Sequence, residues 1–184
     1  MNIPNLLSLS RLPLAVVLFV CIHHEAWLLG LVVFCIAGIT DWADGFLARR
    51  WNQQTAVGRS LDPLTDKVLL NGAFIFFIPV PSAGITTWMV AVIVGRELLV
   101  TGIRGMVEAT GAKFAADWFG KLKTILQFAV IIALLLLLSM RSFGWLPATW
   151  DAVDSIYRIL LWAMLVATVG SGLQYCWKAW KVLK

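Results

Sequence analysis

The sequence predicts an all-α integral membrane protein with six transmembrane helices. Of its 184 residues, 60% are hydrophobic and only 14% are charged, and the mean hydropathy is +0.85. Its apolar stretches reach the roughly 17 to 25 residues that a helix needs to cross a hydrocarbon core about 30 Å thick. This composition excludes an ordinary soluble protein and leaves no separate aqueous domain. We therefore expect a single membrane domain over residues 1–184.

The expected helices follow one another through short connections. They cover residues 7–23, 26–46, 63–80, 85–105, 122–140 and 155–177. The first is the most polar, because Ser8, Ser10 and Arg11 interrupt it, and residues 1–10 have the alternative of lying along the membrane surface as an amphipathic segment. In the fourth, close helix packing is expected at three glycines, Gly95, Gly102 and Gly105.

Basic residues predict which helix ends face the cytoplasm, because short loops rich in Lys and Arg stay on that side of the membrane. With six spans, all fifteen Lys and Arg residues except Arg141 and Arg158 fall on one side. We therefore expect both termini on the cytoplasmic side. The net charge of +5 follows mainly from this topology, so nucleic-acid binding is not expected.

Four aspartates lie within 26 residues beside these apolar runs. Asp41 and Asp44 come at the end of the second expected helix, where an unpaired charge costs several kcal/mol. Their spacing places them on one helical face with two small residues, Gly45 and Ala48. Small residues on that face leave room for a ligand or a neighbouring backbone.

The second pair of aspartates is expected at the start of the third helix. The polar segment 50–60 should reverse the chain, with its turn at Gly58. Asp62 would then cap the helix and Pro63 would be its first residue, since proline at that position loses no useful donor. Asp66 follows four residues after Asp62 on the same face.

The two acidic helices are therefore expected to meet as an antiparallel pair with four carboxylates at one membrane depth. Like charges about 4 Å apart repel by roughly 4 kcal/mol per pair at an effective dielectric constant near 20. Either some carboxylates are protonated or cations bridge them. An all-oxygen site suits Mg²⁺ or Mn²⁺, and two divalent ions would cancel four carboxylates.

The acidic segment resembles the signature of the CDP-alcohol phosphotransferase family. That signature is D-x2-D-G-x2-A-R-x8-G-x3-D-x3-D, and all eight fixed positions match within residues 41–66. The start of the chain is similar as well, with Pro4-Asn5 and Arg11 at the family's offsets and Ser8 where the family tends to have Thr. The start at residues 2–5 and the run Gly95-Arg96-Glu97-Leu98, followed by Arg104, resemble the phosphatidylglycerophosphate synthase branch.

The resemblance implies an enzyme that moves a phosphatidyl group from CDP-diacylglycerol to an alcohol and releases CMP. It implies two Mg²⁺ or Mn²⁺ ions held by Asp41, Asp44 and Asp62, with Asp66 near them and also acting as general base toward the acceptor hydroxyl. The CDP-lipid pocket would be lined by Asn5, Asp44, Gly45, Ala48, Arg49 and Gly58. A homodimer in a bacterial inner membrane, with its site facing the cytoplasm, is implied as well.

In the branch that the chain resembles, the acceptor is sn-glycerol 3-phosphate, whose phosphate needs a second anion site. The guanidinium group of arginine suits this role, because it can donate two parallel N–H groups to the oxygens of one phosphate. The candidates are Arg59, Arg96, Arg104, Lys121 and Lys123, each with the alternative of being a charge that only sets topology. Other acceptors in the same family, namely serine, inositol phosphate, choline or a phosphatidyl lipid, stay open. A small cation transporter is the alternative from another class.

Overall fold

The computed structural model describes residues 3–50, 56–109 and 118–183, and it describes the side chains of residues 11–40, 65–107 and 118–181. These residues form α1 (Ile3–His23), α2 (Trp27–Arg50), α3 (Ala56–Phe77), α4 (Thr87–Ala109), α5 (Trp118–Phe143) and α6 (Trp150–Leu183). Two short 3₁₀ helices, η1 (Pro81–Ala83) and η2 (Pro147–Thr149), precede α4 and α6. The described part of the chain has no strand, so the all-α prediction is confirmed.

Each α-helix occupies one of the six expected ranges, but α3 begins earlier than predicted. It starts at Ala56, so Gly58 is helical and does not make the predicted turn, and Asp62-Pro63 lies inside the helix instead of starting it. Both predictions are wrong because a local capping signal is a weak prior that tertiary packing overrides. Membrane helices tolerate an internal proline, since neighbouring groups satisfy the freed backbone carbonyl, and Pro13 inside α1 is a second case.

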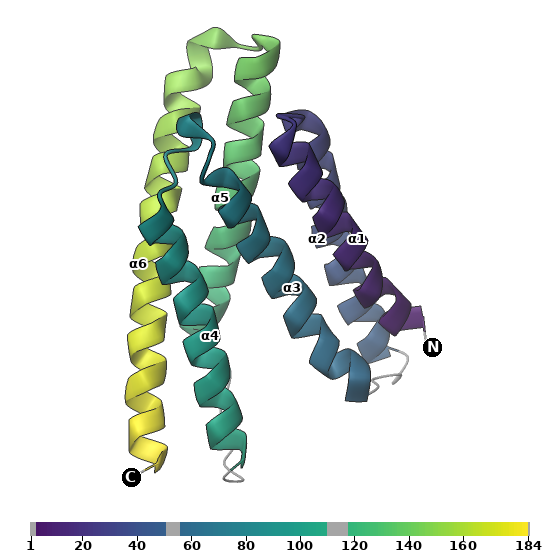
Figure 1. The fold of residues 1–184 in the computed structure, drawn as a ribbon, viewed down its shortest axis with the longest axis vertical. Coiled ribbons are helices and arrows are strands. Elements are labelled where there is room, and N and C mark those ends of the chain that lie inside the picture. Colours follow the sequence, from purple (N-terminus) through teal and green to yellow (C-terminus); the bar gives the residue numbers. More distant parts are fainter. Residues whose placement is uncertain (1–2, 51–55, 110–117, 184) are drawn as a thin grey trace.

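The six helices form two arms that meet at one end and separate at the other (Figure 1). The first arm holds α1, α2 and α3, with α1 packed against both of the others. In the second arm, α6 packs against α4 and α5, and contacts between α2 and α5 join the arms. Both termini lie at the separated end, which is called the open end below.

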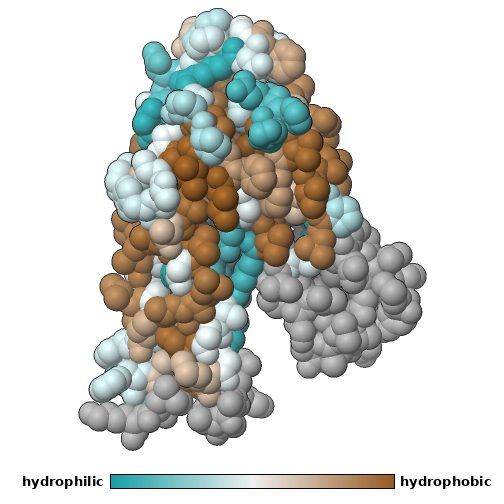
Figure 2. Space-filling view, in the orientation of Figure 1, coloured by the Kyte–Doolittle hydropathy of each residue, from teal (hydrophilic) through white to brown (hydrophobic). Residues whose placement is uncertain are grey.

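The helices are apolar on both their inner and their outer faces. A continuous buried core includes Leu18, Phe34, Phe74 and Leu134, each fully buried. Large apolar side chains also cover much of the outside, and Figure 2 shows them as hydrophobic surface on both arms. A helix that is hydrophobic all round is typical of a membrane span. Among the described residues, two segments are long and apolar enough to cross a membrane, Trp118–Phe143 and Pro147–Lys181. Two further apolar helical segments are shorter, Arg11–His23 and Trp27–Thr40.

The glycines of α4 do not have the predicted packing role inside the chain. A Cβ atom built at Gly95, Gly102 or Gly105 would meet no atom of the described residues within 4 Å beyond the helix itself. The expectation of close packing at these positions is therefore wrong within a single chain. The helix instead presents an open face at these three glycines, as far as the described residues show.

Candidate active site

Asp66 is the motif aspartate whose side chain the structure describes, and it is paired with a buried arginine. Arg11 of α1 is only 1% exposed, and its Nη1 donates a hydrogen bond to Asp66 Oδ1 on α3. By the sequence pattern alone, Arg11 is one of the cations that set topology. A buried guanidinium must be paired, however, because its desolvation is costly. Arg11 therefore ties α1 to α3 and orients the Asp66 carboxylate.

A cavity of about 170 Å³ lies beside Asp66, between α3, α4 and α5, and most of the residues that line it are polar or charged. Its walls are Asp66, Lys67, Leu70, Asn71, Glu97, Lys123, Thr124 and Gln127. Figure 2 shows hydrophilic atoms on the wall of the hollow between the two arms. Polar groups inside a membrane bundle are expensive and therefore indicate function. A cavity of this size suits a small polar molecule, since a water molecule takes up about 30 Å³ in the liquid.

A buried carboxylate that pairs with two cations forms one side of this cavity. Lys123 of α5 is 3% exposed and Glu97 of α4 is 7% exposed. Lys123 Nζ and Arg96 Nη1 both donate to the same oxygen, Glu97 Oε1, the second at 2.9 Å. The carboxylate thus joins α4 to α5 and holds two cations close to one another.

Lys67, the residue after Asp66, links α3 to α4. Its Nζ donates to Thr101 Oγ1, whose own hydroxyl donates to the Glu97 carbonyl at 2.6 Å. The contact lies between two helices that otherwise touch little. Lys67 therefore brings a cation to the cavity wall directly beside the Asp66 carboxylate.

Several buried polar atoms around the cavity have no hydrogen-bond partner among the described residues. They are Asn71 Oδ1, both amide atoms of Gln127, and Nε and Nη2 of Arg96. An unmade hydrogen bond of this kind costs about 1 to 3 kcal/mol. Native proteins rarely leave such groups unsatisfied, so the cluster indicates a place for water or a polar ligand. Asn71 and Gln127 are not among the site residues predicted from the sequence, although a polar residue within an apolar run is a signal that could have found them.

Arg96 and Arg104 both lie against a tyrosine of α6. The Cζ atoms of the two arginines are 5.6 and 5.8 Å from the centre of the Tyr175 ring, and Arg104 Nη2 donates to Tyr175 Oη at 3.0 Å. Of the five predicted acceptor-binding residues, the structure thus connects Arg96, Arg104 and Lys123 through Glu97 and Tyr175. Lys121 instead lies on the exposed surface of α5.

The remaining predicted site residues have side chains outside the described part. They are Asn5, Asp41, Asp44, Gly45, Ala48, Arg49, Gly58, Arg59 and Asp62. The backbone of all nine is helical, within α1, α2 and α3, so the predicted helical spacing of each aspartate pair holds. The prediction that the two acidic helix ends meet depends on these side chains, so it also lies outside the described part of the chain.

The predicted metal centre fits the chemistry of its residues. Four carboxylates, spaced i, i+3 on α2 and i, i+4 on α3, are hard oxygen donors of the kind that Mg²⁺ and Mn²⁺ prefer. Among the side chains that the structure describes, no three His, Cys, Asp or Glu residues gather into a rival site. His23 is the last residue of α1 and His24 follows it, so both lie at the other end of that helix from Asn5 and Arg11.

Comparison with known proteins decides the family. The model of the CDP-alcohol phosphatidyltransferase family matches residues 1–170. The chain belongs to this family. This CDP-alcohol phosphatidyltransferase is similar to proteins named CDP-diacylglycerol–glycerol-3-phosphate 3-phosphatidyltransferase. The Bacillus subtilis (strain 168) protein is 34% identical, over 100% of this chain and 97% of its own length. The Salmonella choleraesuis (strain SC-B67) protein is 38% identical and the Shigella flexneri serotype 5b (strain 8401) protein 36%, each over 95% of this chain and 92% of its own length.

Proposed function

We propose that this CDP-alcohol phosphatidyltransferase transfers the phosphatidyl group of CDP-diacylglycerol to sn-glycerol 3-phosphate, giving phosphatidylglycerophosphate and CMP. The relatives named for this reaction match nearly the whole chain. The observation that carries the acceptor assignment is the group of cations around the cavity beside Asp66, two of which, Arg11 and Lys123, are buried. The reaction belongs to phospholipid biosynthesis.

The charge around the cavity favours a phosphorylated acceptor. Lys67 and Lys123 line it, and Arg11 and Arg96 pair with its two carboxylates, so cations outnumber carboxylates among these described groups. A phosphate monoester carries a charge of about −1.5 to −2 near pH 7 and would compensate the excess. Choline is a cation and serine is zwitterionic, so neither would supply that compensation.

In the proposed reaction, the hydroxyl oxygen of glycerol 3-phosphate attacks the phosphorus that bears diacylglycerol, in line with the departing CMP. Asp66 accepts the hydroxyl proton, and Arg11 holds the carboxylate in place for that transfer. Arg96, Arg104 and Lys123 hold the acceptor's phosphate, while Arg59 and Lys121 remain further candidates for that part. Phosphoryl transfer depends mainly on such positioning and on neutralising charge.

The motif residues would bind the nucleotide end of the donor. Asp41, Asp44, Asp62 and Asp66 would hold two Mg²⁺ or Mn²⁺ ions, which when bound would neutralise the pyrophosphate and stabilise charge on the leaving oxygen. The proposed CDP-lipid pocket consists of Asn5, Asp44, Gly45, Ala48, Arg49 and Gly58. The lipid tails would stay in the bilayer beside the bundle.

We also propose that residues 1–184 form one membrane domain whose six helices all cross the bilayer, with the open end in the cytoplasm of a bacterium. In a six-span topology, all Lys and Arg residues except Arg141 and Arg158 belong to that side, where the soluble acceptor would be available. We propose a homodimer as well. The open face of α4 at Gly95, Gly102 and Gly105 supports it, because small residues let a second helix approach closely.

The test is to supply the purified full-length protein with CDP-diacylglycerol, Mg²⁺ and one acceptor at a time, and to measure both CMP and the lipid product. The panel is glycerol 3-phosphate, serine, inositol phosphate, choline and phosphatidylglycerol. Product is expected with glycerol 3-phosphate. Turnover with another acceptor and none with glycerol 3-phosphate would refute the assignment. Cation flux in liposomes without CMP release would favour the transporter.

A further inference from the structure

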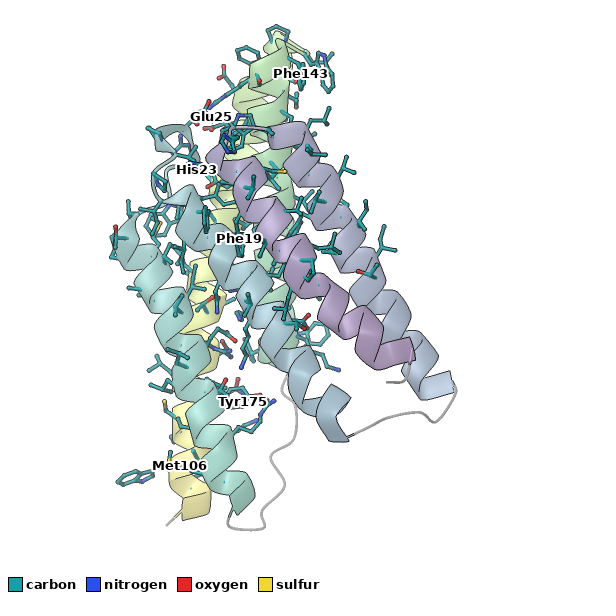
Figure 3. The ribbon with its side chains drawn as sticks, turned by 45° about the vertical axis from the view of Figure 1, so that its right-hand side comes forward. Phe19, His23, Glu25, Met106, Phe143 and Tyr175 are labelled. Atoms are coloured by element: carbon teal, nitrogen blue, oxygen red, sulfur yellow. The ribbon has the colours of Figure 1, made fainter. Side chains whose placement is uncertain are left out.

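We propose that Tyr175 is a positioning residue that sets the guanidinium groups of Arg96 and Arg104 for one anionic ligand, the phosphate of the acceptor. This inference rests on the proposed function, since it assigns a part in acceptor binding to a side chain of α6. Tyr175 is 2% exposed. It lies toward the open end of the bundle, where α4 and α6 pack together (Figure 3).

The two arginines need something to bring them together. They are eight residues apart on α4, so their backbones differ by about 12 Å along the helix axis. A single phosphate can contact both only if their side chains reach toward a common point. The Tyr175 ring provides that point, because both Cζ atoms lie within 6 Å of its centre. Attraction between each cation and the ring also offsets the repulsion between the two like charges.

The hydrogen bonds of the two arginines leave a donor edge for a ligand. Arg104 is held by the Tyr175 hydroxyl at 3.0 Å, and Arg96 is held by Glu97 through Nη1 alone. The Arg96 side chain is only 10% exposed, and its Nε and Nη2 have no hydrogen-bond partner among the described residues. These two nitrogens form the fork edge of a guanidinium, which binds phosphate oxygens in a bidentate manner.

A second position on α6 is also fitted to Arg96. Gly172 comes three residues before Tyr175, on the same side of α6. A Cβ atom built at Gly172 would lie 3.1 Å from Arg96 Cγ, which is closer than an ordinary contact. The helix therefore leaves space for the stem of Arg96 and places an aromatic ring under its head.

The experiment compares Tyr175→Phe and Tyr175→Leu with Tyr157→Phe in the full-length protein, using CDP-diacylglycerol, Mg²⁺ and glycerol 3-phosphate. Tyr157 is a matched control, since it lies on the same helix, is 1% exposed, and donates its hydroxyl to the Ala83 carbonyl at the other end of the bundle. For Tyr175→Phe, we expect the KM for glycerol 3-phosphate to rise about threefold to tenfold, because one hydrogen bond is lost. For Tyr175→Leu, the rise should be about thirtyfold or more, because the ring is lost as well.

The two Tyr175 variants should keep kcat and the KM for CDP-diacylglycerol within about twofold of wild type, as expected when only acceptor binding is weakened. Tyr157→Phe should leave both KM values unchanged. Should Tyr175→Leu fail to fold, Tyr175→Phe decides, with Gly172→Ala as a second variant expected to raise the same KM. An unchanged acceptor KM in a folded Tyr175→Phe enzyme, or an equal rise in both KM values, would overturn the inference alone. A wild-type protein that releases no CMP with glycerol 3-phosphate would overturn the proposed function, and the inference with it.

Discussion

Replacing Glu97 by glutamine would leave Lys123 buried without its counter-charge. The side chains of Glu97 and Lys123 are 9% and 4% exposed, so bulk water solvates the uncompensated ammonium group poorly. Breaking a buried ion pair from one side costs about 3 to 5 kcal/mol. Lys123→Met should cost less, about 1 to 3 kcal/mol, because Glu97 keeps its bond to Arg96. The double variant should be more stable than Glu97→Gln alone, because it no longer contains the unpaired ammonium group.

The free energy of unfolding of the wild type, both single variants and the double variant can be measured by SDS titration in mixed micelles, followed by circular dichroism. The coupling between the two substitutions should be about 2 kcal/mol or more. The control is Arg158→Met, which breaks a 2.6 Å pair with Asp154 on a side chain that is 60% exposed. That change should cost less than about 1 kcal/mol. Additivity of the two single costs to within about 0.5 kcal/mol would refute the reasoning.

Three further outcomes follow from the site and from the surface of α4. Asp66→Asn should keep CDP-diacylglycerol binding but lower kcat by about 10² to 10⁴, because an amide cannot accept the hydroxyl proton, and near-normal turnover would reassign the base. Chelation with EDTA should stop CMP release and added Mg²⁺ or Mn²⁺ should restore it, whereas full activity in EDTA would contradict the metal proposal. Gly102→Leu should shift the protein toward monomer in size measurements in detergent, while Gly170→Leu, at an open position on α6, should not. A dimer that persists in Gly102→Leu would exclude this seam.

The positions of the helices were largely predictable, because apolar length and composition are local properties of the chain. The start of α3 was not. Asp62-Pro63 has the chemistry of a helix start, yet the helix extends back to Ala56. The α4 glycines illustrate the same limit, since small size permits close packing but does not say which helix comes close.

Arg11 shows why charge counting alone missed part of the candidate site. A count of basic residues treats every Lys and Arg near a helix end as a solvated charge. The fold buries Arg11 against Asp66 and buries Lys123 against Glu97, so these cations belong to the interior. The offset of Arg11 from Pro4-Asn5 was a usable signal, whereas nothing in the sequence around Tyr175 pointed to its two arginines.

The sequence by itself determined the fold class, the six helices and the family, because hydrophobic length and the spacing of eight fixed residues are both properties of a linear chain. The tertiary structure alone decided which polar side chains meet. It joined Asp66 to Arg11, Glu97 to Lys123, and Tyr175 to two arginines, across three different pairs of helices. The physical reason is that a buried charge selects its partner by three-dimensional proximity in a medium of low dielectric constant, and that proximity depends on how whole helices pack.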